Sequence, residues 1–346
     1  MKYVIVLLFL SLFILGCAQN TQPPPDTINS NNTIVPPIEN KTTIVIKNST
    51  EYEPPIIGNQ TLPPSLQPPT GPVVTPSYLQ TPNDKFAIYF INTGTDGLQG
   101  DAILIKKGEF DMLIDTGTEV SGPTVVDFLK SHGVDDLEVL ASTNADPDHY
   151  GGMKNVLDTF GVEEFWWSGK LYGDKTYENL IRSVNDRSIS IKEVSRGENY
   201  SFNGLQVLVL NPSATRSFGD RDNDAITLKI TQDQFCTLLT SGILAGAQAD
   251  VINIPNFNPH CNILEIPGHG LGRATTNIGP FLVRIAPTDV IFSGARDDPS
   301  ADKKGTRFIL YDKLNATKTK YYENYKNGTV RITSDGFQYI IEYLTE

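Results

Sequence analysis

The sequence has little positive charge and no extended basic cluster. Its 346 residues include 28 lysines and arginines against 40 aspartates and glutamates, a formal net charge of −12 at pH 7. The longest basic stretches are two lysine pairs, at 106 and 303, and the "KTK" at 318. Tight non-specific binding of nucleic acid requires a concentrated basic surface, so the composition counts against that class while leaving a local basic groove open.

The sequence also lacks an apolar run at its start that is long enough for a settled transmembrane helix. The run from Tyr3 to Leu15 follows Lys2 and ends at "LGC", whereas about 20 apolar residues are needed to span a bilayer. This pattern predicts a signal peptide over residues 1–17. The "ILG" before Cys17 resembles a lipobox, which predicts a lipid on Cys17; an ordinary signal peptide is the alternative.

Cysteine is scarce, with three in the whole chain. If Cys17 carries the lipid anchor, Cys236 and Cys261 remain as an even pair. An exported protein is in an oxidising location, so a disulfide between them is an expectation that the sequence alone leaves open.

Residues 18–84 are rich in Pro, Asn and Thr and show no useful helical or strand periodicity. Such a segment buries too little apolar surface to offset its chain entropy, so we expect a disordered stalk with a reach on the order of 45 Å. The predicted location is the outer face of the cell membrane, through the lipid anchor, or the extracellular space. Seven Asn-x-Ser/Thr sequons fit an exported glycoprotein: Asn31, Asn40, Asn48, Asn59, Asn199, Asn315 and Asn327.

From residue 85 to 346 the pattern predicts one folded domain of interleaved strands and helices. Strand-like runs cover 85–92, 101–107 and 109–115, followed by a helix over 122–133 and a buried strand over 137–143. Further along we expect helices near 151–160, 175–187 and 307–314, strands between them, apolar runs over 280–285 and 289–294, and a closing hairpin. Many strands are joined by short turns, which favours a mixed α/β sandwich with sheets inside and helices outside.

The loop "TNADPDHYGG", residues 143–152, carries three candidate metal ligands at a predicted strand-to-helix turn. Asp146, Asp148 and His149 supply carboxylate and imidazole groups, the usual ligands of Zn²⁺ and Mn²⁺ in proteins. The loop lacks a histidine at its start.

Residues 86–343 resemble a metallo-β-lactamase-fold domain, most of all the hydrolase domain of ComEC-type competence proteins. Seven landmarks occur in order: "LQGDAILI", "LIDTG", the 143–152 loop, "NDAITLKI", "CTLLTSGI", "LEIPGHG" and "TSDGFQYII". The resemblance implies an αββα fold with a metal site on one edge that activates water for hydrolysis, with DNA as the suspected substrate.

The resemblance carries over only part of the ligand set. It implies roles for Asp148 and His149 in holding metal and orienting water, but Asn144, Gly242 and Gly268 stand where the family has ligands. A dinuclear site is therefore not expected. Two interpretations remain. Either the site holds no metal, or one Zn²⁺ or Mn²⁺ ion is held by Asp148, His149 and His269, assisted by Asp146.

Structural interpretations compete with these roles. Asp146 and Asp148 would also suit caps of the helix near Gly151, and His269 would suit a hydrogen-bonded packing position. Asp115 is expected to shape the turn after its strand, behind the metal ligands. His132 is expected to be a surface residue at a helix end, Asp222 and Asp224 are expected to form a solvated turn, and His260 stands in a loop of unknown position.

Two hypotheses about function follow. The first is a surface binding or accessory module whose metal site is degenerate, with extracellular DNA or a separate membrane channel protein as partner. The alternative is a metal-dependent surface hydrolase of the phosphodiesterase or nuclease type with a mononuclear site. Fold alone does not fix the substrate, so β-lactamase activity is the least favoured function.

Overall fold

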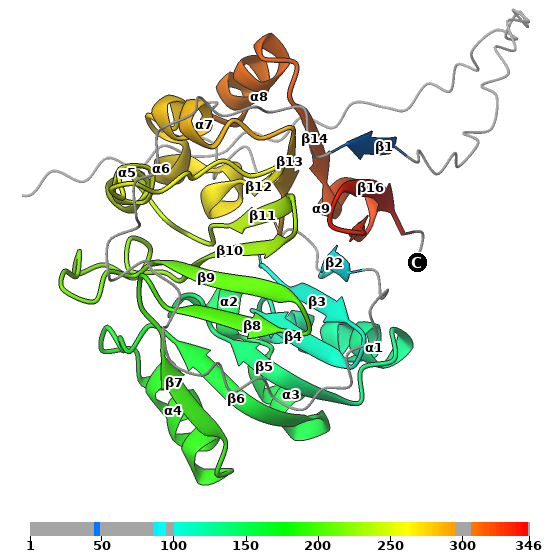
Figure 1. Ribbon diagram of the computed structural model, residues 1–346. Helices are drawn as coiled ribbons and strands as arrows, with labels where there is room; N and C mark the ends of the chain where they lie inside the picture. Colours follow the sequence, from blue (N-terminus) through cyan, green and yellow to red (C-terminus); the bar gives the residue numbers. More distant parts are fainter. Residues whose placement is uncertain (1–44, 49–85, 95–99, 295–305, 345–346) are drawn as a thin grey trace, which may run out of the picture. The chain divides into compact units, whose positions relative to one another are not determined.

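The computed structural model describes residues 45–48, 86–94, 100–294 and 306–344. These residues form two sheets with helices on their outer sides (Figure 1). The nine strands of the first sheet are, in spatial order, β1 (Val45–Asn48), β16 (Gln338–Tyr343), β15 (Val330–Ser334), β2 (Phe86–Phe90), β3 (Ile103–Lys107), β4 (Phe110–Ile114), β5 (Asp136–Ala141), β6 (Gly161–Trp167) and β7 (Ser190–Glu193). The seven strands of the second are β14 (Lys320–Glu323), β13 (Asp289–Phe292), β12 (Ile263–Glu265), β11 (Phe235–Leu239), β10 (Thr227–Gln232), β9 (Leu205–Asn211) and β8 (Asn199–Phe202).

The two sheets pack face to face. A single apolar cluster joins residues of both, including Phe86 and Trp166 from the first sheet and Phe235 from the second. Each strand alternates its side chains between this shared core and an outer face, so each outer face is apolar as well and must be covered.

Helices cover both outer faces. On the first sheet lie α1 (Gly122–Ser131), α3 (Met153–Thr159) and α4 (Lys175–Asp186), whose apolar residues join the outer cluster of that sheet. On the second lie α5 (Ala245–Ile252), α7 (Gly279–Ile285) and α8 (Thr306–Ala316). The remaining helical segments are short: η2 (Glu119–Ser121), α2 (Pro147–Tyr150), η3 (Pro267–Gly270), α6 (Gly272–Thr275) and α9 (Asn324–Asn327). The predicted αββα sandwich is confirmed.

Local sequence signals account for most boundaries. Helix α1 begins with a proline in its first turn and stops before Gly133, which has φ of +71°. Helix α4 is capped by Asp174, whose carboxylate accepts from the backbone N–H groups of Thr176 and Tyr177. The apolar run at 280–285, whose type the pattern left open, forms helix α7.

One local prediction is confirmed with an addition, and another needs correction. The helix expected over 151–160 is α3, and the separate short helix α2 precedes it. Within the stalk, Val45–Asn48 forms β1 and pairs antiparallel with β16. Its sequence, "VIKN", follows two threonines and an isoleucine, and such β-branched residues favour a strand where a sheet edge offers unpaired backbone groups.

Other predictions fall on residues that the structure does not describe. They are the signal segment 1–17 with Cys17, most of the stalk, and the sequons at Asn31, Asn40 and Asn59. Of the remaining sequons, Asn315 and Asn327 are exposed and Asn199 is half-buried. Within the described ranges, none of the helices combines the length and the apolar character that crossing a bilayer would require.

One edge of the sandwich gathers the loops that matter for function. Strands β4 and β5 of the first sheet end there, as do the parallel strands β11, β12 and β13 of the second. Because β3 runs antiparallel to β4, its beginning lies at the same edge. Residues that follow or precede these strands in distant parts of the sequence are therefore brought together.

Candidate metal site

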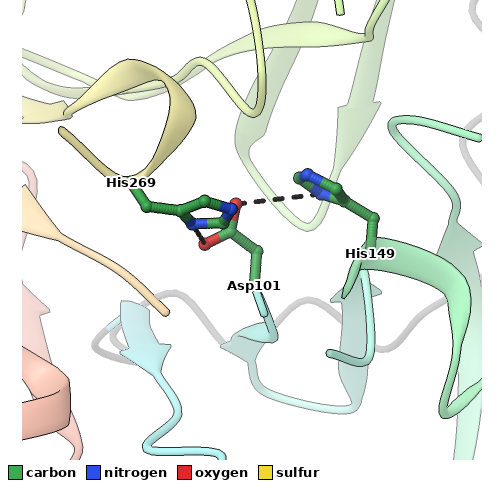
Figure 2. A group of neighbouring side chains, drawn as sticks. All are labelled: Asp101, His149 and His269. Atoms are coloured by element: carbon green, nitrogen blue, oxygen red, sulfur yellow. Dashed lines mark ion pairs between the residues drawn. The ribbon is translucent and has the colours of Figure 1, made fainter. Parts of the chain in front are cut away.

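Three buried side chains from separate loops converge at this edge. Asp101 precedes β3, His149 lies in α2 after β5, and His269 lies in η3 after β12 (Figure 2). One potential ligand atom from each lies within 4.8 Å of the others. Among the described residues this is a group of histidines and carboxylates that could hold a metal ion.

The backbone fixes the position of Asp101. Its N–H donates to the carbonyl of Asp148 at 3.2 Å, and its carbonyl accepts from Gly117 at 2.6 Å. The carbonyl of His149 in turn accepts from Thr116 at 2.7 Å. These hydrogen bonds join the 143–152 loop to the turns around β3 and β4. They hold Asp101 between the two imidazole rings, as Figure 2 shows.

Both histidines use their Nδ1 atoms for contacts inside the protein. Nδ1 of His149 lies 2.7 Å from Oδ2 of Asp115, and Nδ1 of His269 lies 2.9 Å from the carbonyl oxygen of Ser293. Each acceptor requires a proton on Nδ1, so the lone pair of the neutral ring is on Nε2. Holding a ligating histidine through its other nitrogen is the usual support of a metal site.

Asp148 lies on the Nε2 side of both rings. One of its carboxylate oxygens is 4.0 Å from Nε2 of His149, and the other is 3.5 Å from Nε2 of His269. Ligand atoms about 2.0–2.1 Å from a tetrahedral zinc ion lie roughly 3.3 Å from one another. The distance of Asp148 from His269 is close to this value, and its distance from His149 is longer by about 0.7 Å.

Asp101 lies on the opposite, Nδ1 side. Its carboxylate oxygens are 3.4 Å from Nδ1 of His269 and 3.8 Å from Nδ1 of His149. Since both Nδ1 protons are already donated to shorter acceptors, Asp101 serves these rings as a buried counter-charge. The Nε2 side of the two rings, where Asp148 lies, is therefore the side on which a neutral ring offers its lone pair.

The charges of the cluster are strongly coupled. Burial lowers the pKa of His149, but Asp115, Asp148 and Asp101 outweigh burial and raise the pKa to about 10. The pKa of His269 is also raised, by Asp101 and Asp148 against the effect of burial. Burial raises the pKa of Asp148, but the two histidines reverse this and leave it below its usual value. Without metal, two imidazolium ions thus balance the surrounding carboxylates.

Metal uptake should therefore release two protons near neutral pH, one from each Nε2. Because the pKa of His149 is raised to about 10 and the pKa of His269 is also raised, both metal-free rings are protonated near neutral pH, and the apparent affinity should rise by up to about a hundredfold per pH unit there. Calorimetric titrations with Zn²⁺ in buffers of different ionisation enthalpy count the released protons. Titration without proton release would show that the ion does not bind at these imidazoles.

Glu265 ends β12 behind the cluster and is fully buried. Its Oε2 accepts from the backbone N–H groups of Thr240 at 2.7 Å and Ser241 at 3.1 Å. Burial, followed by the charge of Asp101, raises the pKa of Glu265 to about 8. Its Oε1 and Oδ1 of Asp101 have no hydrogen-bond partner among the described residues, and both residues line a cavity of about 10 Å³, roughly the space of one water molecule.

The raised pKa makes Glu265 a source of alkaline instability. A glutamate whose folded-state pKa exceeds its unfolded value contributes stability that is full below pH 4.5 and is lost as the pH rises through about 8. Glu265→Gln keeps an acceptor for the two backbone donors and removes this titration. We expect its melting temperature to exceed that of the wild type by several degrees at pH 9 and to differ less at pH 5. Equal differences at both pH values would contradict the account.

Asp146 does not join the cluster. Its carboxylate pairs with the guanidinium of Arg221. The competing helix-cap interpretation also fails, because the side chain of Asp146 makes no capping hydrogen bond and Asp148 lies inside α2. The two aspartates of the loop therefore have different partners: Asp146 pairs with Arg221, and Asp148 faces the two histidines.

Neighbouring residues occupy the space that a side chain at Gly242 or Gly268 would need. A Cβ atom on Gly242 would lie 2.9 Å from Nδ2 of Asn144, and one on Gly268 would lie 2.5 Å from Cβ of Ala274. Gly268 also has φ of +55°, a conformation that disfavours side chains. Restoring a ligand at either glycine would require the surrounding residues to move.

The remaining assignments divide between agreement and correction. Asp115 lies behind His149, in the supporting position that the sequence indicated, and also accepts from the N–H of Thr143 at 2.8 Å. His132 follows α1 as its C-cap. The interpretation of Asp224 as part of a solvated turn is wrong: it is 1% exposed and accepts from Tyr172 at 2.7 Å. His260 contacts the carbonyl of Ile285 and is not part of the cluster.

The two cysteines lie close together without a disulfide. Cys236 and Cys261 are both buried and free, and the two thiols hydrogen-bond to each other. Cys236 also contacts the carbonyl oxygen of His260 at 3.3 Å. The sequence allowed a disulfide; the structure has two reduced neighbours.

Sequence reasoning missed Asp101, Glu265 and Arg221. Asp101 stands in "LQGDAILI", a landmark of the resemblance that was not connected to the ligands. The signal that could have found it is its place just before a strand that pairs with the strand ending just before Asp115, because the two aspartates then lie at the same edge of the sheet. Arg221 and Glu265 carry no local pattern that distinguishes them from an ordinary loop cation or an ordinary strand residue.

Comparison with known proteins supports the family resemblance. Residues 95–172 match the model of the metallo-beta-lactamase superfamily. ComE operon protein 3 of Bacillus subtilis is 23% identical over 221 residues, which cover 58% of this chain and 28% of that protein. This chain thus spans about a quarter of its relative's length.

Two solved structures are similar to this chain at low sequence identity. A variant of the β-hydroxylase CmlA, an enzyme of Streptomyces venezuelae, matches with a TM-score of 0.50 and 12% identity over 73% of this chain and 54% of CmlA. The metallo-beta-lactamase fold protein YhfI from Bacillus subtilis matches with a TM-score of 0.45 and 10% identity, over 74% of this chain and all of YhfI. The predicted resemblance is confirmed, and the domain has the metallo-beta-lactamase fold.

Proposed function

We propose that this chain is a metal-dependent hydrolase of phosphodiesters with a mononuclear site. The observation that carries the proposal is the arrangement of His149 and His269, whose Nε2 atoms face Asp148 while their Nδ1 atoms are held from behind. An arrangement that only packed the rings would not require both Nε2 atoms to face one carboxylate. This favours the alternative of the two sequence-based hypotheses.

Each residue has a distinct part in this proposal. Asp115 and the Ser293 carbonyl keep protons on Nδ1, and Asp101 balances charge beneath the rings. Asp148, whose side chain is 32% exposed, is the member open to solvent, so its carboxylate can accept a hydrogen bond from an attacking water and orient it. A bound Zn²⁺ or Mn²⁺ ion would act as a Lewis acid and lower the pKa of water at the site.

The proposed substrate is single-stranded DNA outside the cell. The resemblance to ComEC-type competence proteins motivates this substrate, and because the similarity to ComE operon protein 3 covers only 28% of that protein, the role is carried over as a proposal. The net charge of −12 predicts weak, salt-sensitive binding of the strand. Exposure to such a substrate would follow from the proposed lipid anchor at Cys17 and the stalk, with a separate membrane channel protein as the partner in uptake.

Cleavage assays test the proposal directly. Purified protein loaded with Zn²⁺ or Mn²⁺ should cleave a labelled single-stranded oligonucleotide, a chelator should abolish cleavage, and readdition of the ion should restore it. His149→Ala should be inactive under every condition. Metal-loaded protein that leaves phosphodiester substrates intact would reject the hydrolase function.

The second candidate is a binding or accessory module without catalysis. It is favoured by the three changed ligand positions and by the engagement of Asp146 with Arg221. Under this function, binding of DNA or of an envelope protein would persist undiminished after chelation. The two candidates are thus separated by whether removal of metal removes the effect.

A further inference from the structure

The loop over residues 217–224 contacts the 143–152 loop. Asp224 anchors this loop, because its carboxylate accepts from the hydroxyl of Ser217 and from the N–H of Phe218 at 2.9 Å. The anchored loop places Arg221 against residues 145 and 146. There its Nη1 donates to the carboxylate of Asp146 and, at 3.1 Å, to the carbonyl of Ala145.

Arg221 is a permanent cation at this place. Partial burial lowers its pKa, but Asp146, Asp174 and Asp222 outweigh that effect and raise it. A guanidinium group matches a carboxylate geometrically and stays charged at any physiological pH. About a third of the side chain, 34%, remains exposed, so some of its N–H groups are open to solvent.

Two of the three changed ligand positions, Asn144 and Gly242, lie together beside Asp222. Asn144, which replaces the first histidine, is 2% exposed, and its Nδ2 lies 3.4 Å from Oδ1 of Asp222. Its Oδ1 has no hydrogen-bond partner among the described residues. A Cβ on Gly242 would lie 2.9 Å from Nδ2 of Asn144 and 3.4 Å from Oδ1 of Asp222. The space of the missing carboxylate at 242 is thus occupied by the side chains of Asn144 and Asp222.

Oxygen atoms gather near one cation: Arg221 pairs with Asp146, the charge of Asp222 also acts on Arg221, and Asn144 contacts Asp222. Asp146, Asp222 and the unpartnered oxygen of Asn144 are the donors that a hard divalent ion would take. In this chain Arg221 supplies the positive charge instead, and Arg273, with Nη2 at 3.7 Å from Asp222, adds a second. Without a cation, the two carboxylates would repel each other in a partly buried setting.

We propose that the guanidinium of Arg221 takes the place of the second metal ion, so that the site combines one metal position with one fixed organic cation. This inference rests on the proposed function, which supplies the single metal position. It explains why Asn144, Gly242 and Arg221 occur together: the neutral amide and the glycine leave room for the loop that delivers the arginine. The exposed N–H groups of Arg221 then face an anionic substrate from beside the metal position.

Metal stoichiometry tests the inference without relying on catalysis. The full chain and its Arg221→Gln variant are titrated with Mn²⁺ by calorimetry, and the number of bound ions is counted. Arg221→Gln removes the charge but keeps a hydrogen-bond donor near Ala145. We expect one ion in the wild type and two in the variant, the second bound at least tenfold more weakly and lost again when Asp146→Asn is added.

Two further variants make the result specific. Arg221→Lys keeps the positive charge and should bind one ion, like the wild type. Arg221→Ala, measured in parallel with circular dichroism as a check of folding, should behave like Arg221→Gln, so either neutral variant suffices if the other fails to fold.

The outcomes separate this inference from the proposed function. One ion in the wild type and still one in a folded neutral variant would overturn the substitution by Arg221 while leaving the mononuclear function standing. No ion in the wild type and one in the neutral variants would support the substitution and reject the function. Two ions in the wild type would overturn both.

Discussion

Replacement of His149 by alanine should abolish tight metal binding and also destabilise the metal-free fold. Loss of residues that merely support a metal ligand costs about 10- to 100-fold in affinity, so loss of a ligand should cost more than about 100-fold. The imidazolium also neutralises Asp115, which is 1% exposed. Removing one partner of a buried ion pair costs about 3–5 kcal/mol.

Elemental analysis and denaturant unfolding check the two halves of this prediction. His132→Ala is the matched control, because His132 is a histidine at the end of α1 that is not part of the cluster. The control should keep its metal. Wild-type metal content in folded His149→Ala would remove His149 from the site.

Asp115→Asn should weaken metal binding while the fold is kept. Asparagine retains an oxygen for the N–H of Thr143 but can place an NH₂ group opposite Nδ1 of His149, where Asp115 now accepts at 2.7 Å. Two donors then face each other, which favours the tautomer with its proton on Nε2 and removes the lone pair needed by the ion. We expect a loss of about 10- to 100-fold in metal affinity.

The same variant should change the titration of His149. Burial lowers its pKa, and the charge of Asp115 is the first of the contributions that raise it to about 10. In Asp115→Asn, NMR of the metal-free protein should therefore show His149 titrating at lower pH. Asp289→Asn, at a buried aspartate that accepts from Tyr339 at 2.7 Å in the other sheet, is the control and should leave that titration unchanged. An unaltered His149 pKa in Asp115→Asn would refute the positioning role.

Much of the fold could be predicted because periodicity and turn residues report local structure. The strands before Asp101 and Asp115, the helix ending near His132 and the order of landmarks all follow from short-range patterns. The exception at 45–48 depends on the free edge of β16, almost 300 residues away in the sequence, which no local pattern can reveal. The short helix α2 likewise lies in the 143–152 loop, whose backbone hydrogen bonds to the turns around β3 and β4 come from distant parts of the sequence.

The site was predictable only where its residues stand in one motif. Asp148 and His149 are adjacent in sequence, and His269 stands in a second landmark. Whether Asp146 joins them depends on Arg221. This arginine lies 75 residues further along the chain, in a loop of the second sheet. The role of Asp101 depends on the antiparallel pairing of β3 with β4. Such long-range charge pairing is set by tertiary structure, so residue type and spacing do not determine it.

The most direct test of the account is the metal content of the purified full chain. Protein dialysed against trace Zn²⁺ and Mn²⁺, and then against metal-free buffer, is measured by elemental mass spectrometry. The account predicts about one tightly held ion per chain, absent from His149→Ala. Two ions per chain, or none, would contradict a mononuclear site held by Asp148, His149 and His269.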